Sequence, residues 1–338
     1  MIKSTRGNPY HVPKGSPRGG QFCSRNGFAK DFKSDSVLTV ENDDSHYENR
    51  TKLRSFQITR AEYESRESDS RIELKITDFE PAKTKEEAVE FAKSLGVTPY
   101  YDGLSLNACN TINGSMQALF REFPETKKNL NVIGSAQEIN RALKKEVKKT
   151  VFDYCQKEGR QYDESVKVAK AIASKSAGKV MRSWAAFYRC NENCSSVLYD
   201  VEEKFKGVYI NEKSADTDSA LLNKRCAVSK KYHPVGCDTF KSTIDHEFGH
   251  VIDKSYGITK DMTGCISKGR GVVYIKGSDH GFEGAFNGEE VENGLSEYAK
   301  EDVREFVAEA WAEFKNNPNP RPIAKAVGMK IETLGRSR

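Results

Sequence analysis

Residues 242–257 read STIDHEFGHVIDKSYG, and this stretch decides the fold that we expect around it. Positions four apart lie one turn above each other on a helix, so His246 and His250 present their imidazole rings to the same point. This HExxH pattern is typical of a zinc-binding helix, in which Glu247, next to the first histidine, reaches a metal-bound water as general base. The stretch therefore predicts two zinc ligands and a catalytic carboxylate on one helix.

The same residues carry the signals of a helix. Ile244, Phe248 and Val251 stand at positions i, i+4 and i+7 and form an apolar stripe. Ser242 is a candidate N-cap, because its hydroxyl can accept a hydrogen bond from the first turn. Gly257 is a candidate C-cap, because glycine readily adopts the left-handed conformation that closes a last turn. We expect a helix bounded by these two residues.

A catalytic zinc needs a third protein ligand and one open position. The pattern HExxHxxGxxH would supply a nearby histidine, but this chain has Asp253 and Tyr256 where that pattern has Gly and His, which excludes metzincins. His280 is a possible nitrogen ligand, although its glycine-rich surroundings, KGSDHGFEG, make a poor rigid mount.

A pair of glutamates further along the chain is the better source of the third ligand. Glu305 and Glu309 stand four apart in LSEYAKEDVREFVAEAWAEFKNNP, a strongly helical run. Paired carboxylates on a helix are usually only solvated, but these follow HExxH in a chain that still needs a ligand. The apolar side of this helix consists of Phe306, Ala310, Trp311 and Phe314.

These two motifs together resemble a known family. The run HEFGHVID at 246–253, followed by Tyr298 and EFVAEAW at 305–311, resembles the catalytic domain of anthrax lethal factor and its relatives, zinc endopeptidases of the gluzincin group. The resemblance covers about residues 200–316. It departs from the family pattern between His250 and Glu305, where Gly, Lys and charged residues fill 257–295.

The resemblance implies a role for each matching residue. The zinc ligands are expected to be His246, His250 and Glu305. The general base is expected to be Glu247, and the residue that stabilises the oxyanion is expected to be Tyr298, seven positions before the third ligand. Glu309 matches the second acid of the glutamate helix, which orients a ligand histidine, and we expect Asp253 to support the ligands in the same way.

The run KGVYINEK at 206–213 is prone to form a β-strand. It resembles the element before the zinc helix in those enzymes, where an exposed strand edge pairs with an extended substrate. The resemblance thus implies substrate binding by Val208, Tyr209 and Ile210, with Asn211 at the end of the edge. An ordinary core strand is the alternative.

The rest of the chain reads as α+β. Residues 71–79, RIELKITDF, alternate as a half-buried strand does. A helix should follow, because Thr84 and Glu87 make a capping box and Gly96 can close the last turn. Further helices are expected over 106–123, 139–156 and 164–188, the first of them ended by Pro124, and TPYY at 98–101 is expected to be extended.

Residues 1–70 read as a flexible arm, rich in Gly, Pro, Ser, Arg and Asp and without an apolar period. The first 33 residues hold seven Lys or Arg against one acid, Asp31, so contact with DNA through this arm is a weak possibility. VPKGSPRGGQF at 12–22 resembles segments of tailed-phage structural proteins, which implies phage head or portal proteins as partners and a virion setting. No apolar signal-peptide core follows the basic start and no run is long enough to span a membrane, so we expect synthesis in a cytoplasm, with delivery into a host cell left open.

The chain has eight cysteines, which we expect to be mostly small, reduced core residues. One grouping could instead hold a structural zinc, although it lacks tight CxxC spacing. It consists of Cys190, Cys194, Cys226 and Cys237.

The sequence as a whole predicts an α+β, zincin-like metallopeptidase with a small sheet packed on helices. We expect an arm over 1–70, an α+β to helical N-terminal part of the catalytic unit over 71–190, and a zincin core over 191–338. The expected function is a Zn²⁺-dependent endopeptidase of gluzincin type, phage-encoded and virion-associated, with a polypeptide substrate. The alternatives are a phage structural or assembly protein with an inactive zincin-like domain, and a toxin that acts on a host protein.

Overall fold

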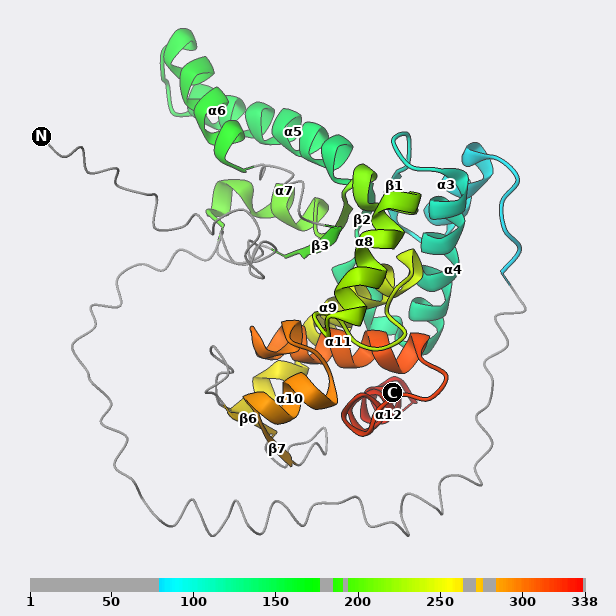
Figure 1. The fold of residues 1–338 in the computed structure, drawn as a ribbon. Helices are drawn as coiled ribbons and strands as arrows, with labels where there is room; N and C mark the ends of the chain where they lie inside the picture. Colours follow the sequence, from blue (N-terminus) through cyan, green and yellow to red (C-terminus); the bar gives the residue numbers. More distant parts are fainter. Residues whose placement is uncertain (1–78, 177–184, 191–193, 264–271, 276–283, 337–338) are drawn as a thin grey trace, which may run out of the picture.

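The computed structural model describes residues 79–176, 185–190, 194–263, 272–275 and 284–336 (Figure 1). The arm over 1–70, His280 and all but the last residue of the strand expected at 71–79 lie outside these residues. The described chain is α+β, as expected from the sequence, with a small sheet among many helices. Within it, no helix is both long and apolar enough to cross a membrane.

The helices pack around a small sheet, and short 3₁₀ turns lie in several of the connections between elements (Figure 1). The α-helices are α3 (Lys85–Ser94), α4 (Leu106–Glu122), α5 (Ala136–Lys157), α6 (Tyr162–Ser176), α7 (Tyr199–Lys204), α8 (Asp218–Ser229), α9 (Phe240–Tyr256), α10 (Gly288–Gly294), α11 (Val303–Asn316) and α12 (Pro322–Arg336). The 3₁₀ turns are η1 (Pro124–Asn129), η2 (Ser196–Leu198), η3 (Glu212–Ser214), η4 (Ile258–Asp261) and η5 (Tyr298–Lys300).

Local signals set the helix ends in the N-terminal half. The Thr84 side chain accepts a hydrogen bond from the Glu87 backbone N–H at the start of α3, which is one half of the predicted capping box, whereas the Glu87 side chain accepts from the Lys83 N–H instead of that of Thr84. The helix ends just before Gly96, which has a φ of 87° and so takes the left-handed conformation that closes it. Helix α4 ends at Glu122, and Pro124 then begins η1, because proline cannot continue an α-helix.

The main sheet has four strands in the order β1-β2-β4-β3. Three of them run parallel, and the last runs antiparallel to its neighbour. They are β1 (Thr98–Tyr100), β2 (Val132–Ser135), β4 (Gly207–Ile210) and β3 (Ala186–Arg189). A separate antiparallel sheet has the order β5-β6-β7, with β5 (Met262–Thr263), β6 (Val272–Ile275) and β7 (Gly284–Asn287).

Two of the sequence predictions about this sheet are wrong. Strand β4 lies between β2 and β3 and its residues Val208, Tyr209 and Ile210 are fully buried, so it is a core strand without an exposed edge for a substrate. Residues 186–189 form β3 instead of the end of a helix. The physical reason is tertiary, because pairing with β4 and stacking of the Phe187 ring on Tyr209, at 4.9 Å, outweigh local helical periodicity.

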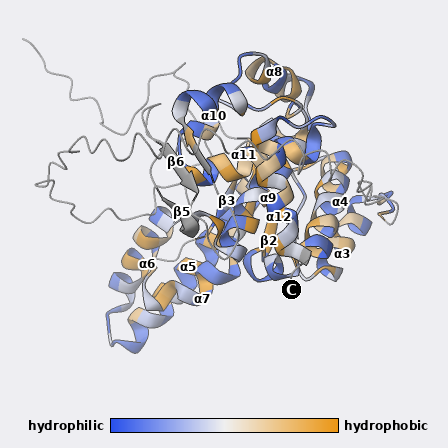
Figure 2. Ribbon diagram, turned by 90° about the horizontal axis from the view of Figure 1, so that it is seen from below, coloured by the Kyte–Doolittle hydropathy of each residue, from blue (hydrophilic) through white to orange (hydrophobic). Residues whose placement is uncertain are grey.

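Two hydrophobic clusters cover opposite faces of the sheet. Val208 and Ile210 point into the larger cluster, which includes α4, α9, α11 and α12, while Tyr209 points into the smaller one under α5, α6 and α7. This alternation follows from the period of two in a strand. Figure 1 shows the α5–α6 hairpin projecting from the sheet, away from α9 and α11. Figure 2 shows hydrophilic and hydrophobic segments alternating along α3, α5 and α6, as amphipathic helices require.

Helices α9 and α11 cross at very close range, and a glycine makes this possible. A Cβ atom placed on Gly249 would lie 2.7 Å from the Cα and 3.3 Å from the Cβ of Ala308. Since non-bonded carbon atoms rest at about 3.5–4.0 Å, only glycine permits this approach. The contact holds the helix with the two histidines against the helix with the two glutamates.

Candidate metal centre

Helix α9 carries the HExxH motif and has a cap at each end. Its N-cap is Thr239 and not Ser242, which sits three residues inside the helix. The two side chains cap each other's backbone N–H groups, so Ser242 completes a reciprocal capping box instead of starting the helix. Gly257 closes the helix as predicted, with a φ of 69° and an N–H that donates to the carbonyl of Asp253.

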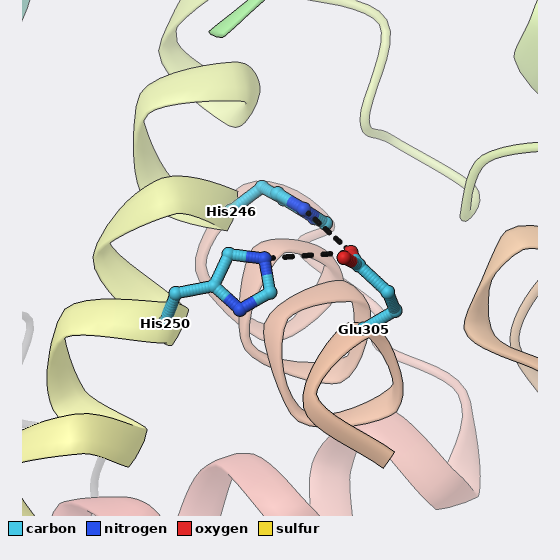
Figure 3. Close-up of side chains that lie close together, drawn as sticks. All are labelled: His246, His250 and Glu305. Atoms are coloured by element: carbon cyan, nitrogen blue, oxygen red, sulfur yellow. Dashed lines mark ion pairs between the residues drawn. The ribbon is translucent and has the colours of Figure 1, made fainter. Parts of the chain in front are cut away.

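The structure brings His246, His250 and Glu305 together (Figure 3). Glu305 Oε2 lies 3.2 Å from His246 Nε2 and 3.4 Å from His250 Nε2, and one ligand atom from each residue lies within 4.8 Å of the others. The two histidines come from α9 and the glutamate from α11, so the close crossing of these helices creates the group. In the described part of the chain, no other three His, Cys, Asp or Glu side chains are close enough to share an ion.

The donor set fits a divalent metal such as zinc, which binds imidazole nitrogens and carboxylate oxygens. Within the described residues, Glu247 Oε2 is buried and has no hydrogen-bond partner, and the buried Glu305 Oε2, although close to both imidazole nitrogens, makes no hydrogen bond of good geometry with them. A buried polar atom without a partner costs roughly 1–3 kcal/mol, so an ion and its bound water would satisfy both atoms. The side chains of the three candidate ligands are only 12–13% exposed.

The electrostatics of the centre also favour a cation. Burial lowers the pKa of His246, but the adjacent carboxylates of Glu305 and Glu309 outweigh burial and raise it to about 10. Burial raises the pKa of Glu305, but His250 and His246 outweigh burial and hold it well below its usual value. Because histidine binds metals in its neutral form, a metal ion would replace the protons on His246 Nε2 and His250 Nε2. The ion would then interact with the Glu305 carboxylate in place of these protons.

Glu309 lies behind His246, on the side away from Glu305. Its Oε1 is 2.8 Å from His246 Nδ1, and its Oε2 accepts a 2.9 Å hydrogen bond from the Ser296 hydroxyl. Burial raises the pKa of this carboxylate, but His233 and His246 outweigh burial and lower it to about 2. A carboxylate at Nδ1 keeps the proton on that nitrogen and leaves Nε2 free to bind a metal.

Glu247 and Tyr298 flank the group. Glu247 is buried, and burial raises its pKa against the opposing effects of His246, His250 and a hydrogen bond from the Tyr188 backbone. Since Tyr188 belongs to β3, the last strand of the sheet runs directly beside this carboxylate. Tyr298 lies in η5, and its ring stacks on His246 with 5.9 Å between the ring centres.

Asp253 lies in the last turn of α9. It accepts hydrogen bonds from the backbone N–H and the hydroxyl of Thr259, at 2.7 and 2.9 Å. These bonds tie the end of α9 to η4. The effect of His250 on the pKa of Asp253 is electrostatic, and the hydrogen bonds described for this carboxylate go to Thr259.

The four cysteines considered for a second zinc do not come together within the described residues. Cys237 is buried, Cys190 and Cys194 are half-buried, and Cys226 is exposed. Of the cysteines that the structure describes, Cys109 and Cys155 are also buried, so the expectation of core cysteines holds for only part of them.

His233 and Ser296 belong to the centre but have no signal in the sequence. His233 Nδ1 lies 3.4 Å from Glu309, and Ser296 donates to the same carboxylate. His233 stands alone in a connecting segment and Ser296 follows a short helix, so neither has a spacing that points to metal chemistry. Only the tertiary structure brings them to Glu309.

Comparisons with known proteins add no assignment. No family model matches the chain, and no significant match emerges among curated proteins or among solved structures.

Proposed function

We propose that the protein is a zinc-dependent endopeptidase of the gluzincin type, with a zincin-like catalytic unit. The observation that carries this proposal is the convergence of His246, His250 and Glu305 beside the buried carboxylate of Glu247. Two imidazoles and one carboxylate would hold the ion and leave room for a water molecule, as at catalytic zinc sites and unlike structural ones.

The three converging residues would hold the ion. A bound zinc would lower the pKa of a water molecule and polarise the carbonyl of the scissile bond. Glu247 takes the proton from the attacking water and passes it to the leaving amine.

Two further residues support the reaction. Tyr298, which stacks on His246, donates a hydrogen bond to the oxyanion of the tetrahedral intermediate. Glu309 holds the tautomer and the orientation of His246 from behind.

The substrate would lie along β3 and not along β4. Strand β3 ends the order of the described main sheet, runs antiparallel to β4, and contacts Glu247 through the backbone of Tyr188. An extended peptide that pairs with such a strand has its carbonyl groups in regular register. We therefore expect the substrate to pair with β3, which lies next to the proposed base Glu247, instead of with β4.

Metal analysis and activity assays on matched variants test the proposal. The purified chain should contain one zinc ion and cleave members of a peptide library, and a chelator should abolish cleavage. Glu247→Gln should retain zinc but lose at least about a hundredfold in kcat, whereas Glu305→Gln should lose zinc. Glu289→Gln changes an exposed glutamate of α10 and should behave like the unchanged protein.

Two results would overturn the assignment. They are peptidase activity that survives in Glu247→Gln, and zinc content that is unchanged in Glu305→Gln. Chelator-resistant cleavage would point to another class of peptidase.

The proposed virion setting rests on the resemblance of residues 12–22, which lie outside the described residues, to segments of tailed-phage structural proteins. Mass spectrometry of purified phage particles would test it, and a chain found only in the soluble fraction of infected cells would contradict it.

A further inference from the structure

The segment between α8 and the HExxH helix makes an unusual turn. Lys231 has a φ of 60°, a left-handed conformation that costs a non-glycine residue about 1–2 kcal/mol. The turn is closed by two hydrogen bonds, from Lys231 N–H to the Val228 carbonyl and from Tyr232 N–H to the Ala227 carbonyl. This is the Schellman arrangement, in which glycine is the usual residue at the left-handed position.

The turn directs two successive carbonyl groups toward the 3₁₀ turn that carries Tyr298. The carbonyl of Lys231 accepts a 2.9 Å hydrogen bond from Glu297 N–H, and the carbonyl of Tyr232 accepts a 3.1 Å bond from Tyr298 N–H. Pro234 comes directly after His233 and restricts the His233 backbone to extended conformations. The backbone of Tyr298 is therefore held by this segment, which is far from it in the sequence.

The side chains of the segment also surround Tyr298. The ring of Tyr232 lies 5.5 Å from that of Tyr298, and the ring of His233 meets it edge-on at 5.6 Å. The ring of His246 lies 5.9 Å from that of Tyr298 as well, so three aromatic rings contact this tyrosine. Aromatic pairs at these separations stabilise a fixed ring orientation.

His233 makes a second contact, with the carboxylate behind the metal centre. Its Nδ1 lies 3.4 Å from Glu309, whose side chain is only 2% exposed and also contacts His246. With the proton on Nδ1, His233 donates to Glu309, whose Oε1 also lies 2.8 Å from His246 Nδ1. The His233 imidazole thus contacts both Glu309, which lies against the candidate ligand His246, and Tyr298.

We propose that Tyr232 and His233 form a positioning segment, with His233 linking the placement of Glu309 to that of Tyr298. This inference rests on the proposed zinc peptidase function. His233 acts through these two residues and not on the substrate. Its Nδ1–H holds Glu309 and so sets zinc affinity, whereas its ring holds Tyr298 and so sets the rate of the chemical step.

Two substitutions separate these roles. His233→Asn places an N–H near the position of Nδ1 but removes the ring, so zinc affinity should stay within about twofold while kcat falls roughly tenfold at unchanged KM. His233→Phe keeps a ring beside Tyr298 but removes the donor, so zinc affinity should fall about tenfold. Val235→Ala changes an exposed side chain two residues away and is the matched control.

The experiment measures zinc affinity by competition with a chromophoric chelator, and kcat and KM on a peptide that the unchanged protein cleaves. Circular dichroism confirms that each variant is folded. If both His233 variants match Val235→Ala in zinc affinity and kcat, the inference is wrong while the proposed function stands. If the unchanged protein does not bind zinc through His246, His250 and Glu305, the proposed function and this inference fail together.

Discussion

The substitution Gly249→Ala tests how the metal centre is built, because it adds one methyl group at the crossing of α9 and α11. The new Cβ would lie 2.7 Å from the Cα of Ala308, about 1 Å closer than carbon atoms normally approach. This Cα atom belongs to the backbone of α11, so the helices must separate to relieve the overlap. We expect a separation on the order of 1 Å.

The effect on stability is a balance of two terms. Overpacking of a core costs about 1–3 kcal/mol, while replacing glycine by alanine inside a helix contributes about 1 kcal/mol in the other direction. The expected net loss is therefore up to about 2 kcal/mol, or a fall in Tm of several degrees for a chain of this size. The effect on the metal should be larger, because Glu305 lies on one helix and both histidines on the other. We expect zinc affinity to fall at least about tenfold.

Calorimetry and chelator competition measure both quantities. Gly114→Ala is the matched control, because Gly114 is also helical but its added Cβ would meet only the Phe79 side chain, at 3.1 Å. This control should keep its zinc affinity, and its Tm should not fall, because the helical preference for alanine offsets the close contact with Phe79. If Gly249→Ala binds zinc as tightly as Gly114→Ala does, close packing of the two helices does not position the ligands and the reasoning is refuted.

Three further predictions concern stability. Lys231→Gly should stabilise the protein by about 1 kcal/mol in urea unfolding, because glycine accepts the left-handed conformation without strain; an unchanged or lower stability would contradict this reason. Arg321→Ala should destabilise by about 3–5 kcal/mol, since it leaves the fully buried Glu313 without its two-point ion pair, and a Tm within one degree of the unchanged protein would refute it. Burial raises the pKa of Cys109 to about 11, so the stability that its neutral thiol contributes is complete below the usual value of 9 and is lost as the pH rises toward 11. The unfolding free energy of the unchanged protein should therefore fall relative to that of Cys109→Ala between pH 9 and pH 11. A difference that stays constant over this range would exclude this titration.

Local signals predicted the helices well where capping and apolar periodicity agree. Thr84 and Gly96 bound α3, Pro124 follows the end of α4, and Gly257 closes α9. The error at Ser242 is small and has a local cause. Thr239 and Ser242 both have hydroxyl side chains that can cap a helix, and their mutual hydrogen bonds decide which residue comes first.

The strands were harder to predict. Residues 186–189 continue a helical pattern in the sequence, yet they form β3 because the edge of β4 is available to them and because Phe187 stacks on Tyr209. The interior position of β4 follows from the pairing of β3 with it, because a strand is interior to a sheet only when it pairs with a strand on each side. Of its two neighbours, β3 is the preceding strand in the chain, but β2 is separated from β4 by α5, α6 and β3.

By itself, the sequence determined the composition of the candidate centre. Two histidines one helical turn apart and a later glutamate helix name the residues that can meet at a metal, because helix geometry converts spacing into direction. Only the tertiary structure decided that they do meet, through the crossing that Gly249 permits, and that His233 and Ser296 join them at Glu309. The physical reason is that periodicity specifies which face a side chain occupies, whereas the approach of two faces depends on packing between residues distant in the chain.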